Sequence, residues 1–293
     1  MTLAVKAASG VAPDPLEEPP HSNGGTGTRG RRQRAMGRLR GEIPPALKVG
    51  LGIGGMVILF GGWAALAASM DTFLLPTPAE TWNAAVELHR SGDLTTDLRA
   101  STTRIVIGYG ASMAIGVVVG VLMGSFRSAE AVLEPQVGFL RYIPASALTP
   151  LFLLWLGIDE TPKVVLILVG TVFYNILMVA DVARAVPKEL VNASYTLGAG
   201  RLRVLGRVIL PHSYPGIIDV ARINLAAAWL MLVVAELLAA QEGLAYRIAR
   251  ATRGRDVDEM FALLLVFGLI GLLSDVGLRQ LRRRTAPWSE GSR

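Results

Sequence analysis

The stretch that decides the fold lies between residues 187 and 211 and reads PKELVNASYTLGAGRLRVLGRVILP. It is polar and helix-forming, and it separates two long apolar segments. Pro187 suits the first turn of a helix, and Glu189 complements the positive end of that helix. Gly198 offers the left-handed conformation that ends a helix. We therefore predict two short helices that meet at a corner of small residues, the second closed by Pro211 at the membrane.

The composition indicates a membrane protein. Of the 293 residues, 52% are hydrophobic and only 18% are charged, which is less charge than a soluble chain of this size carries. A bilayer core about 30 Å thick needs about 20 apolar residues per helix. We predict an all-α membrane protein with about six transmembrane helices, over residues 46–69, 104–126, 131–158, 162–182, 214–240 and 260–278.

The residue types present speak against chemistry on this chain. Cysteine is absent and the three histidines, His21, His89 and His212, are scattered, so no thiol chemistry or zinc site is expected. No nucleophile–base pair or carboxylate pair at catalytic spacing lies within the spans. The chain has no Gly-Lys dipeptide and hence no phosphate-binding loop of the G-x-x-x-x-G-K-[ST] type. We predict no catalytic, metal or cofactor site, and an energy source on another polypeptide.

Charge and composition also divide the chain. Residues 1–43 are rich in Pro, Gly, Ser and Arg and are predicted to be a disordered basic tail, followed by a transmembrane domain over 44–285 and a short tail over 286–293. Basic residues gather on one side of the six spans: the arginines of 29–40, Arg127, Arg141, the loop 184–212 and the arginines of 279–284. The positive-inside rule makes that side, and both termini, cytoplasmic. Arginines that flank membrane helices and set their topology therefore explain the net charge of +6, and no nucleic-acid partner is predicted.

The loop resembles the cytoplasmic signature loop of bacterial ABC importer permeases. That pattern is E-A-A, three residues, Gly, nine residues, Ile, one residue and Leu-Pro. Here it reads Asn192-Ala193-Ser194, then Gly198, then Val208-Ile209-Leu210-Pro211. Asn192 and Ser194 depart from the pattern. The order of further residues is similar to permeases of the nitrate, sulfonate, taurine and bicarbonate importers: Leu75-Pro76-Thr77-Pro78, Ser101, Arg104, Arg141, Pro144, Pro150, Trp155-Leu156-Gly157, Ala235-Glu236 and Gly243-Leu244.

The resemblance implies a type I ABC importer permease in the bacterial inner membrane. It implies a second permease copy, two cytoplasmic ATPase subunits that hold ATP and Mg, and an extracytoplasmic solute-binding protein that delivers a small, anionic solute. It also implies that the loop contacts the ATPase. The residues expected to carry this coupling are Glu189, Asn192, Ala193, Ser194, Leu197, Gly198, Ala199, Gly200, Leu210 and Pro211.

Three residues of the spans are candidates for the translocation path or its gate: Glu236, Arg104 and Trp229. A carboxylate within a span is costly and is by default a candidate functional site. Glu236 could line the path, pair with Arg104 to hold helices together, or face headgroups at the interface. Arg247 and Arg250, expected on the outer side, could favour the arrival of an anion, dock an acidic binding protein or contact lipid.

Two other classes of membrane protein compete with the importer. An ion-gradient-driven secondary transporter often shows internal repeats, and none is evident between the halves of this chain. An intramembrane enzyme needs a nucleophile with a base, or metal ligands, within the spans, and the sequence offers neither. The ABC importer permease is therefore the leading prediction, and the secondary transporter is its alternative.

Overall fold

The computed structural model describes residues 44–70 and 74–288. The predicted tail of residues 1–43 lies outside the described residues, as do residues 289–293 of the predicted C-terminal tail. The chain divides into two compact units, residues 1–59 and residues 60–293. The helix α2 (Pro45–Ser69) is long and apolar enough to cross a bilayer. The remaining helices form the part of the molecule discussed below.

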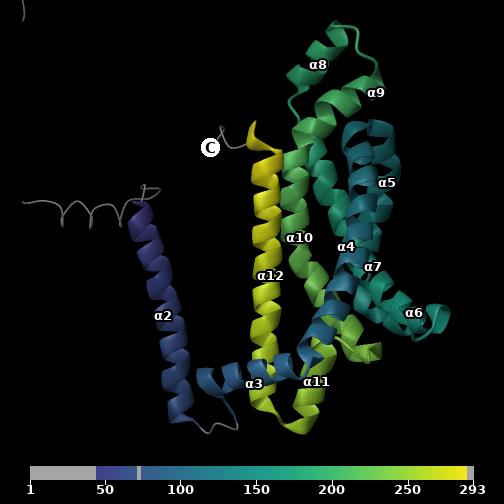
Figure 1. Cartoon of the computed structure of the whole chain (residues 1–293). Coiled ribbons are helices and arrows are strands. Elements are labelled where there is room, and N and C mark those ends of the chain that lie inside the picture. Colours follow the sequence, from purple (N-terminus) through teal and green to yellow (C-terminus); the bar gives the residue numbers. More distant parts are fainter. Residues whose placement is uncertain (1–43, 71–73, 289–293) are drawn as a thin grey trace, which may run out of the picture. The chain divides into compact units, whose positions relative to one another are not determined.

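Helices dominate residues 74–288 (Figure 1). Their order is α3 (Pro78–Arg90), α4 (Asp93–Ser125), α5 (Arg127–Leu140), a 3-10 turn η1 (Ala145–Leu148), α6 (Thr149–Leu156), α7 (Glu160–Arg184), α8 (Lys188–Thr196), α9 (Arg201–Val204), a π-helical turn η2 (Leu205–Ile209), α10 (Leu210–Ala239), α11 (Leu244–Gly254) and α12 (Val257–Thr285).

The predicted all-α membrane fold is confirmed. Among the described residues, five helices are long and apolar enough to cross a membrane. A sixth span is counted when α5 and the η1–α6 segment are taken together, although the two halves are bent by 75°. The proline-interrupted segment predicted over residues 131–158 corresponds to this bent pair. The other long helices begin earlier or end later than predicted, and α4, α7 and α12 extend into charged terminal turns beyond the apolar residues.

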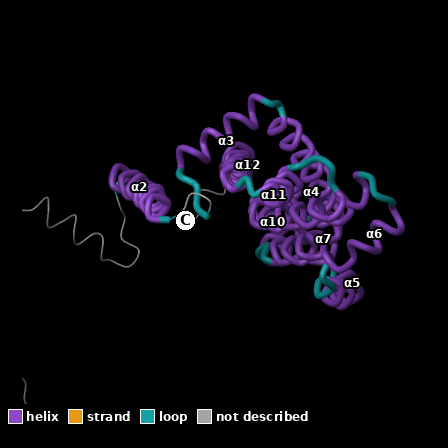
Figure 2. The backbone as a smooth tube through the Cα atoms, turned by 90° about the horizontal axis from the view of Figure 1, so that it is seen from below, coloured by secondary structure: helices purple, strands orange, loops and turns teal. Residues whose placement is uncertain are grey.

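Three helices, α4, α7 and α10, pack together at the centre of the bundle (Figure 2). Glycines on α4 permit the close approach of α7. A Cβ added at Gly116 would lie 2.7 Å from the Asn175 Cβ, and one added at Gly124 would lie 2.4 Å from the Ala180 carbonyl oxygen. Small residues at four-residue spacing therefore let two membrane helices meet backbone to backbone.

A chain of buried polar side chains joins the same three helices at mid-bundle. Asn175 donates to the Ser112 hydroxyl at 2.8 Å, and Asn224 donates to the Asn175 amide oxygen at 2.7 Å. The Thr171 hydroxyl lies 2.8 Å from both the Ser112 hydroxyl and its own helix's Ile167 carbonyl. Because buried polar groups are costly unless paired, these bonds fix the rotation of α4, α7 and α10 about their axes.

The two ends of the bundle differ. The helices α3 and α11 lie at one end, whereas α8, α9 and the last turn of α12 lie at the other (Figure 1). Arg127 begins α5 at the end that carries α8. The sequence predicted Arg127 and Arg141 on the same side of the membrane, but Arg141 does not lie at this end of the bundle. The 14 residues of α5 separate them, a distance of about 21 Å at 1.5 Å per residue.

Candidate functional sites: a protruding loop and a buried ion-pair network

The protruding loop, residues 184–212, extends beyond the other helices of the bundle (Figure 1). In α8 the hydroxyl of Ser194 donates to the Leu190 carbonyl oxygen at 2.8 Å, and that of Thr196 donates to the Asn192 carbonyl oxygen at 3.1 Å. These bonds satisfy the two hydroxyls within the helix itself. No residue of α8 is buried. The loop is therefore a formed helical element whose sides are open.

The corner of the loop forms at Gly198, as predicted. Its φ of +79° is the left-handed conformation that glycine adopts without strain. The amide of Ala199 donates to the Ser194 carbonyl oxygen at 3.0 Å and the amide of Gly198 to the Tyr195 carbonyl oxygen at 2.9 Å, which closes the end of α8. Gly200 is the N-cap of α9 in an extended conformation. The small residues thus make a tight turn between two short helices.

Apolar side chains at this corner point to solvent. Leu197 is 87% exposed and Leu202 is 80% exposed. Leu190 and Ala193, which precede Leu197 at helical spacing on α8, are also exposed. Exposed apolar residues gathered on one element mark a contact surface more often than an ordinary protein face. Glu189 and Asn192 are exposed beside them.

Two details of the loop were predicted wrongly. Pro187 is the N-cap that precedes α8 and does not lie in its first turn. Pro211 does not close the second short helix: α9 runs through the π-helical turn η2 into α10, and residues 201–238 form one continuous span. A proline within a helix lacks an N–H and crowds the carbonyl four residues earlier, and the wider turn directly before Pro211 accommodates this. The corner is therefore joined rigidly to α10.

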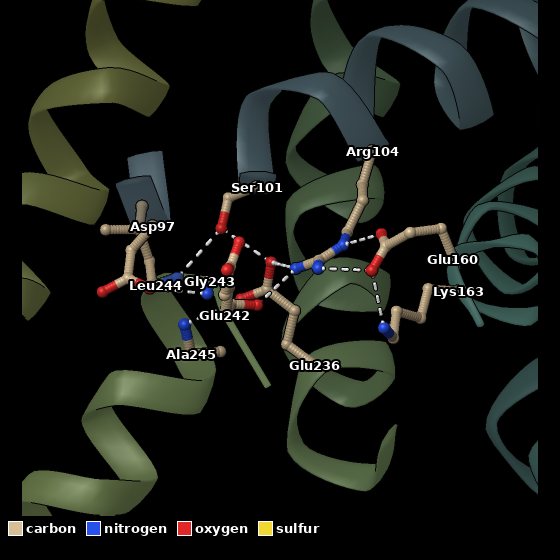
Figure 3. A network of polar contacts seen from close by, with 10 residues as sticks. All are labelled: Asp97, Ser101, Arg104, Glu160, Lys163, Glu236, Glu242, Gly243, Leu244 and Ala245. Carbon is tan, nitrogen blue, oxygen red and sulfur yellow. Dashed lines mark hydrogen bonds and ion pairs between the residues drawn. The ribbon is translucent and has the colours of Figure 1, made fainter. Parts of the chain in front are cut away.

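The second site is an ion-pair network at the opposite end of the bundle, centred on Arg104 and Glu236 (Figure 3). Glu236 is 1% exposed and Arg104 is 3% exposed. The Nη1 of Arg104 lies 2.7 Å from the Glu236 carboxylate and also donates to the Glu242 carbonyl oxygen at 2.7 Å. Its Nε and Nη2 contact the two carboxylate oxygens of Glu160 at 2.5 and 2.8 Å.

Both carboxylate oxygens of Glu236 accept hydrogen bonds. Besides Arg104, it accepts from the Ser101 hydroxyl at 2.6 Å and from the backbone amide of Ala245 at 2.8 Å. A Cβ added at Gly243 would lie 2.4 Å from the Glu236 side-chain carboxyl carbon. Gly243 also has a φ of +131°, which strongly favours glycine. The carboxylate therefore ties α4 and α10 to the turn that begins α11. Of the three alternatives considered for Glu236, the structure shows the pairing with Arg104, and the side chain is not exposed to headgroups.

Arg247 extends the network along α11. It pairs with Asp97, which also accepts from the Gly243 amide at 2.8 Å, and its Nη1 lies 3.0 Å from Asp93. Burial alone disfavours the charged guanidinium, but the hydrogen bond and charge of Asp97 and the charge of Asp93 hold the pKa of Arg247 above its ordinary value. Arg247 is thus committed to internal carboxylates and is not a free cation for an incoming anion, in contrast to what the spacing with Arg250 suggested.

Trp229 does not belong to this network. It is buried in an apolar cluster with Ile105, Tyr109 and Ile167, and its ring lies edge-on to Phe267 at 5.5 Å between centroids. The structure brings together two of the three candidate path residues, Arg104 and Glu236, and places Trp229 in the core of the bundle.

Asp97 and Glu160 are members of the network that the sequence patterns above did not indicate. Asp97, Ser101 and Arg104 recur at i, i+4 and i+7 and so share one face of α4. Polar residues on one face at the start of an apolar helix are the signal that would have found Asp97. Glu160 has no such signal, because its partner is reached through tertiary packing of α7 on α4.

Comparisons with known proteins agree with this geometry. The family described as "Binding-protein-dependent transport system inner membrane component" matches residues 114–287, which include the protruding loop and Glu236. A probable ABC transporter permease protein of Brucella abortus (strain 2308) is 37% identical over 242 residues, which cover 83% of this chain and 96% of that protein. The taurine transport system permease protein TauC of Escherichia coli (strain K12) is 33% identical over 86% of this chain and 94% of its own length.

Another relative is the putative aliphatic sulfonates transport permease protein SsuC of Bacillus subtilis (strain 168), which is 31% identical over 87% of this chain and 90% of its own length. Among solved structures, the MetNI methionine ABC transporter in an inward-facing conformation superposes with a TM-score of 0.58 at 20% identity, over 65% of this chain and 94% of that one. This likeness shows the fold, that of a type I ABC importer permease. The chain belongs to the family of binding-protein-dependent transport system inner membrane components, the permease subunits of ABC importers.

Proposed function

We propose that this permease carries a small, anionic solute across the bacterial inner membrane, and that ATPase subunits drive it through the protruding loop. The observation that carries the proposal is the corner at Gly198, whose apolar side chains are exposed while backbone hydrogen bonds close the turn. A surface of this kind suits a partner that docks and pushes. The coupling role is assigned to the ten residues predicted from the sequence, from Glu189 to Pro211.

The path of force follows from continuity. A partner that moves the corner moves α9, and α9 passes through η2 into α10 without a break in the helix. The helix α10 packs on α7 and α4, so the displacement spreads to the centre of the bundle. We propose that two permease copies rock in this way to give alternating access, with ATP and Mg held by the ATPase subunits.

The proposed solute class rests on the relatives. TauC and SsuC are named for taurine and for aliphatic sulfonates. We propose a solute of this kind, of the nitrate, sulfonate, taurine or bicarbonate type, delivered by an external binding protein to a dimer of this permease. In this arrangement residues 44–285 form the permease domain, and both termini with their tails, 1–43 and 286–293, are cytoplasmic.

The proposal is tested by cross-linking at the corner. The chain contains no cysteine, so single cysteines can be introduced without a background. Thr196→Cys lies on α8, and Thr95→Cys is its matched control at the start of α4. Both threonines are exposed, and each donates its hydroxyl to a backbone carbonyl three or four residues earlier. We expect Thr196→Cys, but not Thr95→Cys, to cross-link to the ATPase in membranes that import the solute. Equal capture at both positions, or none in an importing complex, contradicts the proposal.

A second measurement separates the importer from an ion-gradient-driven transporter. Proteoliposomes that contain the complete complex are supplied with taurine or ethanesulfonate and its binding protein. We expect uptake with ATP present and none with a proton or sodium gradient alone. Uptake driven by the gradient in the absence of ATP indicates the secondary transporter instead.

A further inference from the structure

The bend between α5 and η1 interrupts the helical backbone. The helix α5 ends at Leu140, and the chain turns through Arg141, Tyr142, Ile143 and Pro144 before η1 begins. Pro144 has no N–H to continue a helix and disfavours a helical conformation at Ile143. Non-helical backbone at membrane depth is tolerated only where protein covers it or where it lines a water-filled cavity. The described chain leaves the bend open, since Tyr142 is 75% exposed, so a partner protein, water or a solute must cover it.

The depth of the bend is set by its neighbours on α7. The hydroxyl of Tyr174, near the middle of α7, donates to the Arg141 carbonyl oxygen at 3.3 Å. On the same helix, a Cβ added at Gly170 would lie 3.4 Å from the Ala145 Cβ, at the start of η1. Both contacts place the bend level with the middle of a spanning helix. Arg141 therefore lies within the thickness of the bundle, away from either end.

The guanidinium of Arg141 has no carboxylate partner among the described residues. Its Nη2 donates to the Tyr142 hydroxyl at 2.9 Å, its Cζ lies 4.8 Å from the centre of the Tyr142 ring, and its Nε is enclosed without an acceptor. Arg104 and Arg222, which also lie on spanning helices, are by contrast paired with carboxylates. A cation at this depth is costly unless an anion or water compensates its charge.

We propose that Arg141, supported by Tyr142, is an anion-binding station on the translocation path of this permease, an inference that rests on the proposed transport of an anionic solute. The ligand is a single sulfonate, carboxylate or similar oxyanion group. A planar guanidinium matches two oxygens of such a group at once, and it stays charged at any working pH. The open side of Tyr142, which is 75% exposed, leaves room for the remainder of the solute.

The test is protection of Arg141 from an arginine-selective reagent. The full chain, purified in a neutral detergent, is treated with phenylglyoxal, and modification is followed at each arginine by mass spectrometry. Sulfate, ethanesulfonate and taurine are added in turn, with sucrose as the uncharged control. Arg127, exposed at the other end of the same helix, serves as the internal control for salt and pH. A parallel sample receives phosphatidylglycerol in place of the free anion, to separate a lipid phosphate from a solute.

We expect free anions to slow modification of Arg141 by about tenfold at about tenfold excess over the dissociation constant, with Arg127 unchanged. Three outcomes overturn the proposal. Arg141 does not react even without added anions, as it would if a second copy supplied a carboxylate; it reacts equally with and without anions; or it is protected by lipid alone. None of these measurements needs ATP, a binding protein or uptake. Failure of the proposed function would therefore be recognised separately, by the absence of ATP-driven transport.

Discussion

The two ends of the bundle differ in whether their side chains are buried and paired or exposed. At the end that carries α3 and α11, Arg104, Glu236, Asp97 and Arg247 are buried and paired within one chain. At the end that carries α8, apolar side chains such as Leu197 are exposed and no residue of α8 is buried. Buried ion pairs fix geometry because removing one partner strands the other. The first end is therefore expected to be rigid, and the exposed surface of the second suits the docking of another protein that we propose.

The largest effect is expected where the rigid end loses one charge. Arg104→Met leaves Glu236 buried without its cation, and a broken buried ion pair costs about 3–5 kcal/mol. We expect the free energy of unfolding in detergent to fall by this amount. The control Arg99→Met removes an exposed arginine from the same helix and is expected to leave stability nearly unchanged.

The double variant Arg104→Met with Glu236→Gln sharpens the same comparison. Ser101 and Ala245 donate to separate oxygens of Glu236, and the neutral amide keeps one of these two acceptors without leaving a charge buried, so part of the stability is expected to return. If the double variant is as unstable as the single one, the loss arises from packing around the arginine and not from the stranded carboxylate. If uptake also fails in a stable double variant, Arg104 and Glu236 act in the path as well as in the scaffold.

A smaller effect is expected at Gly243, where a methyl group meets the same carboxylate. Gly243→Ala combines a backbone conformation that costs a side chain about 1–3 kcal/mol with overpacking that costs about 1–3 kcal/mol. Gly92→Ala has a φ of +84° but open space around the added Cβ, so only a backbone cost of about 1–2 kcal/mol is expected. Equal melting temperatures for the two variants would show that the Glu236 contact does not constrain the turn.

At the other end, Gly198→Ala is expected to separate stability from function. The left-handed conformation costs alanine about 1–2 kcal/mol, but α8 can fray locally to relieve it, so the unfolding of the whole bundle is expected to move little. If the correctly placed corner becomes about 1 kcal/mol less stable, the population of correctly placed corner relative to the frayed state falls roughly fivefold. We expect a comparable loss of ATP-driven uptake and of the cross-link at Thr196→Cys.

The matched control for this variant is Gly206→Ala. Gly206 is exposed, has open space for a Cβ and lacks a positive φ. It is expected to leave uptake and cross-linking unchanged. A loss as large as that of Gly198→Ala would mean that the loop is sensitive to any added methyl group, and the left-handed corner would lose its special role.

The difference between the two ends also decides what the sequence could predict. The loop was predictable because its features are local: Gly198, the flanking helices and the apolar face all lie within 25 residues of the printed chain. The long apolar segments likewise predicted about six spans. Local signals of this kind need no knowledge of which helices become neighbours.

The ion-pair network was only half predictable because its partners are distant. Ser101 and Glu236 are separated by 135 positions, and Asp97 and Arg247 by 150. The costly carboxylate was evident, but Glu160 joins the network through Arg104, and Asp97 through Gly243 and Arg247, once α7 and α11 have packed on α4. Arg141 was misplaced for a related reason: its sequence neighbours did not reveal that α5 ends in a bend at half depth.

The smallest effect is expected from an ion pair at the end that carries α8. Arg184 contacts Glu130 at 3.1 Å and Asp181 at 3.0 Å, but the side chains of Arg184 and Asp181 are 41% and 71% exposed, whereas those of Arg247 and Asp97 are 9% and 1% exposed. An exposed pair gains little over water and is screened by salt, so Arg184→Gln is expected to cost at most about 1 kcal/mol. Arg247→Gln, which strands the buried Asp97, is expected to cost several times more.

Both variants are measured as the shift in unfolding free energy at low and at 0.5 M salt. Only the effect of Arg184→Gln is expected to disappear at the higher concentration. If Arg184→Gln lowers the unfolding free energy as much as Arg247→Gln at both salt concentrations, the end that carries α8 is as rigid as the opposite end. Burial then does not explain the contrast between them.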